Sequence, residues 1–583
     1  MHHYIKQIEN NLSESDKQLL QRIYAPQVVA IPPADASRSM CVTEDGEIRI
    51  YGALHKQSPT DVGTPVYIAS RDGGLSWKTV INHSDALGAA TRNPRSGRYM
   101  TTYPNEYRPE WDTSIGLSGT WAVMNDEGFD GRENRLVKLC DRHIDIMKLP
   151  YYLESCDRWL IVGQYAYPDH SKKEVVVFYS DDDGESWGET VLSETAPRFE
   201  PKPPHAGTRW QEYSVEPTVA ELSSGELVMF VRTSQDYYYT YRSADHGESW
   251  SGPVPTDFHG TITMPVLQKL SDGRIVFFWC NTQPMPELDQ RKVFPPLGAD
   301  EVNGIWEDVF TNRDANHLAI TEDDMQTWHG FRELFLNAIR NEADFRSVGG
   351  RNSNDKSVHQ AQMLELPYNK LLVHFGQNIS ARKAVILDLA WLYEQEREED
   401  FRLGLQNVST QMYLKSNLGG FHGFSGHCAY NRTNGALLIP DPAGNFEEVL
   451  QICRVEDERL AYQKQGAVWN FPASHRGRVE VRLSVLGGGV RLSLSDHWYN
   501  PADETVADGA HVSLPITASD GFMTVLLDYD TDKGSVHVTA GDLCCDLPLR
   551  YAAPNGLSYL HVQTLSEGED RKGTLIKSFK KTV

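Results

Sequence analysis

The sequence lacks any long apolar run. No stretch of its 583 residues is long and apolar enough to cross a bilayer. The first residues, MHHYIKQIENNLSESDKQ, hold no apolar core of the kind that a secretion signal needs. We therefore expect a soluble, cytoplasmic protein without a membrane partner, or a secreted one if a signal has been removed.

Cysteine is scarce and has no metal-type spacing. The eight cysteines include no paired CxxC motifs. Cys544 and Cys545 are adjacent, which is an awkward spacing for a mutual disulfide. We expect reduced thiols, no metal site and no cofactor.

Positive charge is also in deficit. Lys and Arg number 56 against 80 Asp and Glu, so the formal net charge is -24. A field of that sign repels nucleic acid and anionic membranes, although it leaves room for a local basic pocket that binds a small anion. Hydrophobic residues make up 40% and charged residues 23%, an ordinary globular mix, and the length predicts two or more domains. The sequence does not determine the oligomeric state.

A short acidic motif that ends in tryptophan is repeated along the chain. The stretch SDDDGESW (Ser180–Trp187) fits the pattern Ser/Thr-x-Asp-x-Gly-x-Ser/Thr-Trp. So do Ser70–Trp77, Ser243–Trp250 and Thr321–Trp328, except that Met325 replaces the glycine of the last copy. Each copy follows a β-branched and aromatic run of the kind that forms strands. The repeats therefore predict a series of hairpins that share one turn.

The spacing of the repeats predicts four-stranded units. The copies start at 70, 180, 243 and 321, which gives gaps of 110, 63 and 78 residues. The two shorter gaps suit one unit each, and the first suits two units, with MNDEGFDG (Met124–Gly131) as a candidate decayed copy. The aspartate can accept backbone N–H bonds within the turn, and the tryptophan can pack between units. The motif lacks the spacing of an EF-hand, so we expect a structural staple and no calcium site.

This pattern resembles the Asp-box of the sialidase superfamily, whose fold is a six-bladed β-propeller. The resemblance covers roughly residues 25–400 and implies an all-β chain. Short alternating strands such as RVEVRLSVL, separated by Gly, Asp and Pro turns, predict a β-sandwich after the propeller. The predicted domains are a helical extension (1–25), a catalytic six-bladed propeller (26–386), a connector helix (387–405) and a jelly-roll, lectin-like sandwich (406–583).

The stretch EPTVAELSSGELVMFVRT, from Glu216 to Thr233, carries the clearest candidate site. A carboxylate opens it and a guanidinium closes it, with a hairpin between them, so Glu216 and Arg232 can face the same mouth of a propeller. The sialidase family frames a glutamate and an arginine in the same way. Guanidinium groups that converge on one point form a clamp for a carboxylate.

The resemblance implies three further residues. It places Arg38 in the first blade and Arg313 before the last box, as the other two arginines of the clamp. It places Asp61, in a first-blade loop, as the general acid and base. A surface ion pair for each arginine and an ordinary turn for Asp61 remain open alternatives.

One departure from the family concerns the nucleophile. Sialidases use a tyrosine, but the matching strand here begins with His359 and Gln360. Three explanations stay open: a tyrosine of DYYYTY such as Tyr238 reaches the site, His359 activates water, or His359 serves a different acidic sugar by hydrolysis or β-elimination. Three further residues are candidate sugar contacts: Tyr213, Trp279 and Asn281.

The sequence therefore predicts an exo-acting glycoside hydrolase that removes a terminal acidic sugar from a glycan. Sialic acid, or a related ulosonic or uronic sugar, is the expected substrate. A lyase or another glycosidase that uses His359 is one alternative, and a non-catalytic glycan-binding propeller is another. Trp469, Trp498 and Tyr499 of the sandwich are either sugar platforms or core, and we favour core.

Overall fold

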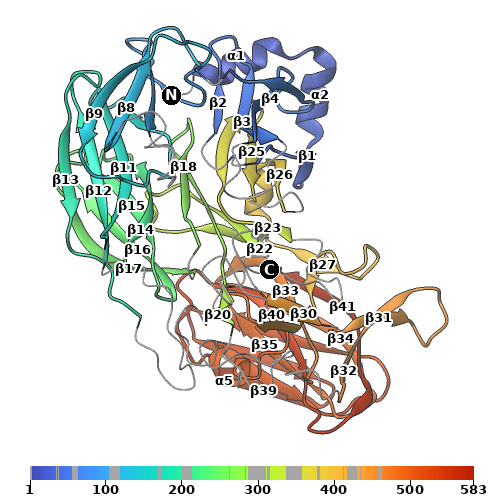
Figure 1. Cartoon of the computed structure of the whole chain (residues 1–583). Helices are drawn as coiled ribbons and strands as arrows, with labels where there is room; N and C mark the ends of the chain where they lie inside the picture. The colour runs from blue at the N-terminus through green and yellow to red at the C-terminus, as the bar shows by residue number, and fades with distance from the viewer. Residues whose placement is uncertain are drawn as a thin grey trace.

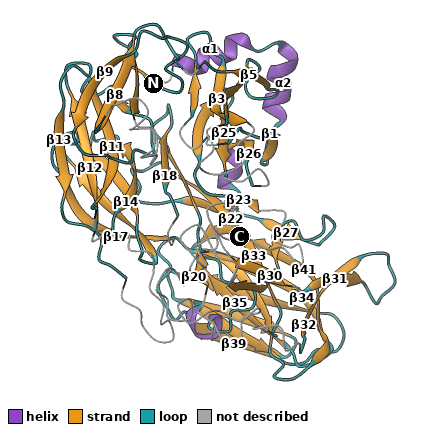
Figure 2. Cartoon of the chain, viewed as in Figure 1, coloured by secondary structure: helices purple, strands orange, loops and turns teal. Residues whose placement is uncertain are grey.

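Nearly all regular structure in the described part of the chain is β-strand (Figure 2). The computed structural model describes residues 3–34, 36, 39–54, 63–83, 85–103, 118–168, 172–199, 213–260, 263–282, 284–285, 310–311, 315–336, 358–376, 381–410, 412–415, 430–433, 435–456 and 463–583. Two helices, α1 (His3–Asn11) and α2 (Glu14–Arg22), precede the first strand.

All described strands before residue 389 except the pair β20–β21 form six four-stranded sheets, arranged one after another round a ring (Figure 1). Blade 1 consists of β2 (Met40–Val42), β3 (Ile48–Leu54), β4 (Thr64–Ser70) and β5 (Lys78–Ile81). Blade 2 consists of β6 (Thr91–Arg92), β7 (Tyr99–Tyr103), β8 (Thr120–Asn125) and β9 (Arg135–Cys140). Blade 3 consists of β10 (Tyr151–Leu153), β11 (Arg158–Ala166), β12 (Lys173–Ser180) and β13 (Gly188–Leu192). Blade 4 consists of β14 (Val215–Glu221), β15 (Leu227–Arg232), β16 (Tyr237–Ser243) and β17 (Ser251–His259). Blade 5 consists of β18 (Val266–Lys269), β19 (Ile275–Trp279), β22 (Ala315–Thr321) and β23 (His329–Leu336).

Blade 6 closes the ring by joining the two ends of the propeller. Its first three strands are β24 (Gln362–Leu366), β25 (Lys370–Phe375) and β26 (Lys383–Asp388), and its fourth is β1 (Gln27–Ala30) from the N-terminus. β1 pairs antiparallel with β26, with Gln27 opposite Ile386. The first strands of successive blades lie side by side, for example β14 beside β18 and β24 beside β2. The predicted six-bladed propeller is thus confirmed.

The N-terminal helices cover the junction of blades 1 and 6. Ile8, Leu12 and Leu20 pack into one apolar cluster with Ile48 of blade 1 and Ile386 of blade 6. Ser13 caps α2, because its hydroxyl accepts a hydrogen bond from the Asp16 amide and the Asp16 side chain accepts one from the Ser13 amide. The helical extension therefore buries apolar surface at the junction where the chain closes the ring.

The repeated motif forms the turn between the third and fourth strands of blades 1, 3, 4 and 5. In blade 4 the Asp245 carboxylate accepts hydrogen bonds from Ser243 Oγ at 2.8 Å and from the Ser249 amide at 2.9 Å. The Ser243 hydroxyl accepts one from the Gly247 amide, and the Trp250 indole donates to the Gly247 carbonyl at 3.1 Å. Each turn is therefore held by side chains that satisfy its own backbone groups.

The two irregular cases have structural reasons. Met325 adopts a positive φ of 69°, the backbone conformation for which glycine is usually required, and its amide still bonds to Thr321 Oγ1. In blade 2 the corresponding turn lies within Met124–Gly131, and Asn125 accepts the amides of Glu127 and Gly128 in place of the motif. Blade 6 has no such turn, because its third and fourth strands come from opposite ends of the propeller.

A β-sandwich follows the propeller, as predicted. One sheet has the order β31 (Leu437–Pro440), β32 (Glu448–Arg454), β41 (Asp570–Thr582), β34 (Arg476–Val485), β37 (Met523–Asp530), β38 (Ser535–Ala540) and β39 (Leu543–Pro548). The other has the order β28 (Val408–Ser409), β33 (Gly466–Ser474), β40 (Leu557–Thr564), β35 (Val490–Ser495) and β36 (Val512–Ile516), and the short helix α5 (Val506–Gly509) precedes β36. Two further pairs are β20 (Pro284–Met285) with β21 (Phe310–Thr311), and β29 (Met412–Lys415) with β30 (Tyr430–Thr433). Side chains such as Trp469, Phe471 and Phe579 fill the space between the two large sheets.

The connector differs from the prediction. Residues 387–405 do not form one helix but contain a five-residue 3-10 helix, η3 (Leu389–Tyr393), and strand β27 (Arg397–Glu399). The apolar half of the stretch buries Leu389 and Leu392 in one turn, and the charged half pairs with β41 at the edge of the sandwich. Sheet pairing overrides helix propensity here, because the last strand of the chain offers β27 a partner.

A buried polar network joins the propeller to the sandwich. His317 of blade 5 bonds through Nε2 to the Tyr559 hydroxyl at 2.5 Å, and Tyr559 donates to Glu333 Oε1 at 2.8 Å. Asn470 accepts the Glu333 amide and donates to the Phe331 carbonyl. All these groups are fully or nearly fully buried. Because buried polar groups are costly to leave unpaired, the network fixes the two domains in one arrangement.

Two further observations concern the whole described chain. No helix among the described residues is long and apolar enough to span a membrane. No disulfide joins the seven described cysteines, and Cys544 lies exposed on β39.

The hydrogen-bonded turns make the first prediction, which concerns stability. Burial opposes ionisation of Asp245, but bonds from Ser249 and Ser243 outweigh it and lower the pKa of Asp245 to about 2. We expect Asp245→Ala to lower the free energy of unfolding at pH 7 by about 1.5–3 kcal/mol, the usual value of hydrogen bonds to a charged group. Because the folded pKa lies below the unfolded value near 3.9, this contribution is present above pH ~4 and is lost as the pH falls towards ~2.

Denaturant unfolding at several pH values measures this effect. Asp520→Ala, at an exposed aspartate of the sandwich, is the control and should change little. If the two substitutions lowered the free energy of unfolding equally at pH 7, the proposed stabilisation of the turn by the Asp245 hydrogen bonds would be contradicted.

Candidate functional site

The predicted pair of Glu216 and Arg232 comes together in blade 4. Glu216 lies at the start of β14, the first strand of the blade, and Arg232 ends β15. Arg232 Nη1 donates to Glu216 Oε2 at 2.9 Å, and the side chains of Arg232 and Glu216 are only 6% and 10% exposed. A buried ion pair of this kind retains its charges only because each partner compensates the other.

Backbone strain orients Glu216. Its φ is 50°, an uncommon value for a residue other than glycine. The register between β14 and β15 shifts between Val215 and Thr218, so the strand carries a bulge at this residue. The Glu216 amide donates to Gln164 Oε1 of blade 3 at 2.7 Å, which holds the bulge in place. Strained residues of this type gather at functional sites because only the surrounding structure keeps them there.

A buried lysine lies beside this pair, and the sequence reasoning missed it. Lys148 precedes β10 and is 9% exposed. Lys148 Nζ donates a hydrogen bond to the Met264 sulfur at 3.6 Å. Burial lowers the pKa of Lys148 to about 7, against a smaller opposing effect of the Glu216 charge. A charged residue within the apolar stretch IDIMKLP was the signal that could have pointed to it.

His374 of β25 brings blade 6 to the same cluster. It is buried, and burial together with the nearby charge of Lys148 lowers its pKa to about 3. His374 Nε2 lies 3.4 Å from Gln362 Oε1, which also accepts the amides of Ser39 and Met40. An amide oxygen can only accept hydrogen bonds, so His374 Nε2 is the donor and carries the proton. A histidine inside the apolar strand KLLVHF was the available signal.

His359 and Gln360 lie just before β24 in blade 6. His359 is 1% exposed, and its Nδ1 accepts the Met264 amide at 3.4 Å. This bond fixes the proton of neutral His359 on Nε2. Gln360 has a positive φ of 60°, as Glu216 does at the start of the first strand of blade 4.

The tyrosines of DYYYTY point to different places. Tyr238 is fully buried, and its hydroxyl bonds to Thr263 Oγ1 at 2.6 Å. Burial raises the pKa of Tyr238, although the charge of Arg232 acts in the other direction. Tyr237 instead lies against His259, with ring centroids 4.6 Å apart and the ring planes tilted by 38°. Tyr213, half-buried, lies three residues before Glu216 in the chain.

Trp279 and Asn281 do not join this cluster, which corrects their predicted role as sugar contacts. Trp279 is fully buried and packs on Phe277, Phe258 and Phe331 within blade 5 and its neighbour. Asn281 donates through Nδ2 to the Asp496 carbonyl of the sandwich at 2.8 Å. Asn281 follows the end of β19 at the contact between the two domains, so its side chain serves that contact.

The aromatic residues of the sandwich are also core. Trp469 and Trp498 are fully buried and Tyr499 is 4% exposed. The Trp498 indole donates to Ser409 Oγ at 3.2 Å. None of these three side chains presents an open face to a sugar. Arg38, Asp61 and Arg313 lie outside the described residues, so their roles remain predictions.

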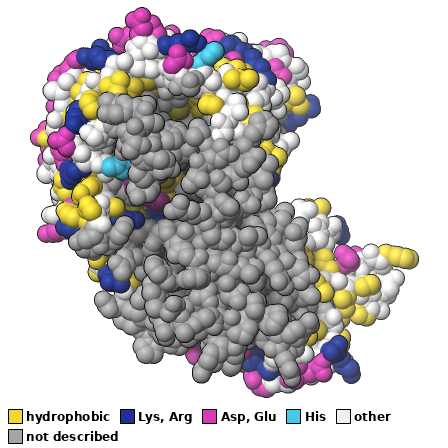
Figure 3. Space-filling view, viewed as in Figure 1, with side chains coloured by type: hydrophobic (Ala, Val, Ile, Leu, Met, Phe, Trp, Pro, Cys, Tyr) yellow, Lys and Arg dark blue, Asp and Glu magenta, His cyan; other side chains and the backbone are white. Residues whose placement is uncertain are grey.

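The charge of the described cluster suits an anion. Glu216 and Arg232 neutralise each other, so protonation of Lys148 leaves one positive charge in excess. On the surface in view, acidic and basic side chains are interspersed over the propeller (Figure 3). The interior therefore holds a local positive charge within a protein of negative net charge. This charge can attract a small anion, although the electrostatic field of the whole protein repels large ones.

Comparison with known proteins agrees with the repeat architecture. Residues 146–344 match the family described as "BNR repeat-like domain". This range holds blades 3, 4 and 5 and three of the four repeated turns. No curated protein matches the chain.

Several solved structures share low similarity with the chain. Trypanosoma rangeli sialidase in complex with sialic acid is 13% identical, with a TM-score of 0.35, over 96% of this chain and 91% of that one. The exo-beta-1,3-galactanase of Phanerochaete chrysosporium with galactose is 6% identical, with a TM-score of 0.31, over 96% and 100%. The match of residues 146–344, together with the repeated turns and the six sheets, indicates a propeller built from BNR-like repeats.

Proposed function

We propose that this chain is an exo-acting glycoside hydrolase that removes a terminal acidic sugar, sialic acid or a related ulosonic or uronic sugar, from a glycan. The observation that carries the proposal is the buried ion pair of Glu216 and Arg232 at the start of β14, beside the buried Lys148. Charged groups that are buried and strained have a stability cost, which favours a role in binding or chemistry.

In this proposal Arg232 and Lys148 bind the sugar carboxylate. A guanidinium fork matches a planar carboxylate, and a protonated lysine adds the charge that the pair of Glu216 and Arg232 lacks. Arg38 and Arg313 are proposed to complete the clamp, and Asp61 to protonate the leaving oxygen. Glu216 orients Arg232 and can accept a proton from an attacking group.

Water is the proposed nucleophile. Among the tyrosines of DYYYTY, Tyr238 is buried and lies close enough to Glu216 for the glutamate charge to act on its hydroxyl. That hydroxyl, however, is hydrogen-bonded to Thr263, and burial raises the pKa of Tyr238. A tyrosine needs a basic partner to attack a sugar, as the family mechanism provides. Attack by water in one step predicts inversion at the anomeric carbon.

The described geometry favours hydrolysis over β-elimination. A lyase would need His359 as a base, but its Nδ1 is occupied by the Met264 amide and its Nε2 carries the proton. His359 in this tautomer donates a hydrogen bond and does not accept a proton. A non-catalytic glycan-binding propeller would use the same pocket without turnover.

Turnover of an aryl sialoside is the direct test. We expect release of the aryl group, and a loss of at least about 100-fold in kcat/KM in Glu216→Gln and Arg232→Met, the usual size of such contributions. Glu226→Gln and Arg242→Met are matched controls, because this exposed pair lies in the same blade with N and O atoms 2.6 Å apart.

The outcomes separate the alternatives. Cleavage of an aryl uronide or ulosonide but not of the sialoside changes the substrate and keeps the reaction. An unsaturated product that absorbs in the ultraviolet indicates a lyase, and saturable binding without any product indicates a binding protein. Equal activity of the Glu216 and Glu226 variants contradicts the site.

Lys148 gives a prediction with two readouts. The pKa of about 7 lies below its ordinary value of 10.5, so the unfolded chain holds more protons between these pH values and stability rises with pH there. Lys148→Met should therefore raise the free energy of unfolding at pH 6 by roughly 1–4 kcal/mol, with a gain that shrinks towards pH ~10. The same substitution should raise KM for the acidic sugar more than it changes kcat.

The pH dependence and a neighbouring lysine provide the controls. In the wild type, kcat/KM should fall as the pH rises through about 7, because the lysine loses the charge that attracts the substrate, and Lys148→Met should remove this step. Lys269→Met, which breaks a contact with Glu221 at 3.6 Å, should show neither effect. A destabilised Lys148→Met with an unchanged pH profile would contradict the assigned role.

A further inference from the structure

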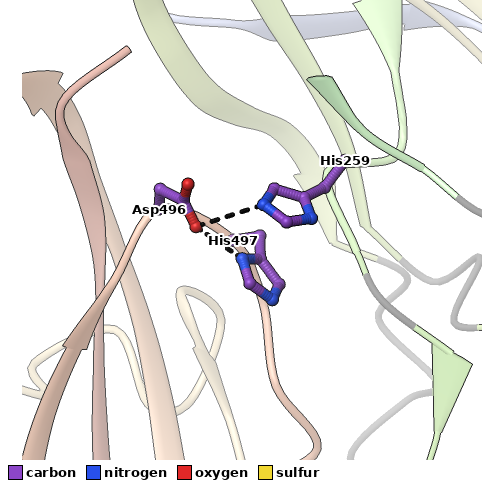
Figure 4. Close-up of side chains that lie close together, drawn as sticks. All are labelled: His259, Asp496 and His497. Atoms are coloured by element: carbon purple, nitrogen blue, oxygen red, sulfur yellow. Dashed lines mark hydrogen bonds and ion pairs between the residues drawn. The ribbon is translucent and has the colours of Figure 1, made fainter. Parts of the chain in front are cut away.

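A cluster of two histidines and an aspartate lies where the propeller meets the sandwich. His259 is the last residue of β17 in blade 4, and Asp496 and His497 directly follow β35 of the sandwich. Figure 4 shows the two imidazole rings and the carboxylate turned towards one another. The proposed reaction does not use this cluster.

The three side chains offer ligand atoms at short range. His497 Nδ1 lies 2.5 Å and His259 Nε2 lies 3.4 Å from Asp496 Oδ1. One ligand atom from each residue falls within 4.8 Å of the other two. The two imidazole rings lie face to face, with centroids 3.7 Å apart. Two rings so close repel each other when both are protonated, so the arrangement suits neutral imidazoles that share a cation or a carboxylate.

We propose that His259, Asp496 and His497 bind a divalent transition-metal ion, with Zn²⁺ as the best fit, and that this ion joins the propeller to the sandwich. Two imidazole nitrogens and one carboxylate oxygen are a donor set that such ions prefer. Mg²⁺ and Ca²⁺ instead prefer sites made of oxygens. The fourth position is left for water.

Binding requires a rearrangement in which the two stacked rings turn so that a nitrogen of each faces the ion. Ligand atoms at about 2.0 Å from a tetrahedral ion lie about 3.3 Å apart, so the distance from His259 to Asp496 already fits. The hydrogen bond between His497 and Asp496 must open by under 1 Å as the ion replaces its proton.

The surroundings hold the aspartate in place for this exchange. The Asp496 carbonyl accepts bonds from Asn281 Nδ2 at 2.8 Å and from Ser558 Oγ at 2.9 Å. The next contact along the chain is between the Trp498 amide and the Asn281 carbonyl, at 3.1 Å. The side chains of His259 and Asp496 are 12% and 15% exposed, so the cluster is enclosed and still reachable from solvent.

Metal titration of the full chain tests the proposal. The protein is first treated with a chelator and dialysed, and Zn²⁺ and Co²⁺ are then titrated by calorimetry and by visible absorption. We expect one equivalent that is bound at this site, a Co²⁺ spectrum without thiolate charge-transfer bands, and a higher Tm with Zn²⁺. His259→Gln and Asp496→Asn should weaken this equivalent by about 100-fold or more, since each removes a ligand.

A second, exposed cluster supplies the control. His537 Nδ1 lies 2.7 Å from Asp546, and its Nε2 lies 3.6 Å from Cys544 Sγ. Because Cys544 and His537 are exposed, adventitious Co²⁺ bound by them would show thiolate bands. His537→Gln should therefore leave the proposed equivalent and the gain in Tm unchanged.

Three results would overturn the proposal. They are the absence of Zn²⁺ and Co²⁺ binding in the wild type, an equivalent that persists in both His259→Gln and Asp496→Asn, or an equivalent that disappears with His537→Gln. Circular dichroism shows whether each variant folds. If both variants of the cluster fail to fold, the wild-type Co²⁺ spectrum decides, because only thiolate-containing binding contradicts the donor set.

Discussion

The pairing of β1 with β26 is the interaction on which the rest of the structure depends. It supplies the fourth strand of blade 6 from the N-terminus and so joins the two ends of a ring of sheets. Without it, β26 would be an open edge with unpaired backbone groups. The helices α1 and α2 then cover the same junction with apolar side chains. Because the ring is closed, the first strands of the six blades meet round one axis, and residues far apart in the chain become neighbours.

The chemistry proposed for this protein uses that convergence. Glu216 comes from blade 4, Lys148 from the segment before blade 3, and His359 and His374 from blade 6. Each side chain is buried, and Glu216 has a strained backbone. A rigid ring can hold such groups because the repeated turns and the apolar contacts between sheets supply stability elsewhere. A local charge excess in this interior is compatible with an acidic protein, since burial weakens screening by solvent.

The contact between the two domains is built from polar groups as much as from apolar ones. The chain of His317, Tyr559, Glu333 and Asn470 satisfies hydrogen bonds on both sides. Such a network specifies one orientation of the sandwich on the propeller, because any other would leave buried donors and acceptors unpaired. The cluster of His259, Asp496 and His497 extends the same junction to a place where an ion can take part.

The sequence by itself determined the repeat, and hence the propeller. Four motifs with matching spacing specify local turns, and these hydrogen bonds lie within eight residues of chain. It also determined the pairing of Glu216 with Arg232, because one hairpin brings the ends of two adjacent strands together. Tertiary structure alone decided the rest. Lys148 and His374 became part of the cluster through ring closure. Trp279 was buried in the core of the propeller, and Asn281 was taken up by the contact between the domains. The predicted connector helix gave way to β27 because β41, from the end of the chain, offered it a partner. These outcomes depend on contacts between distant segments, which local patterns do not encode.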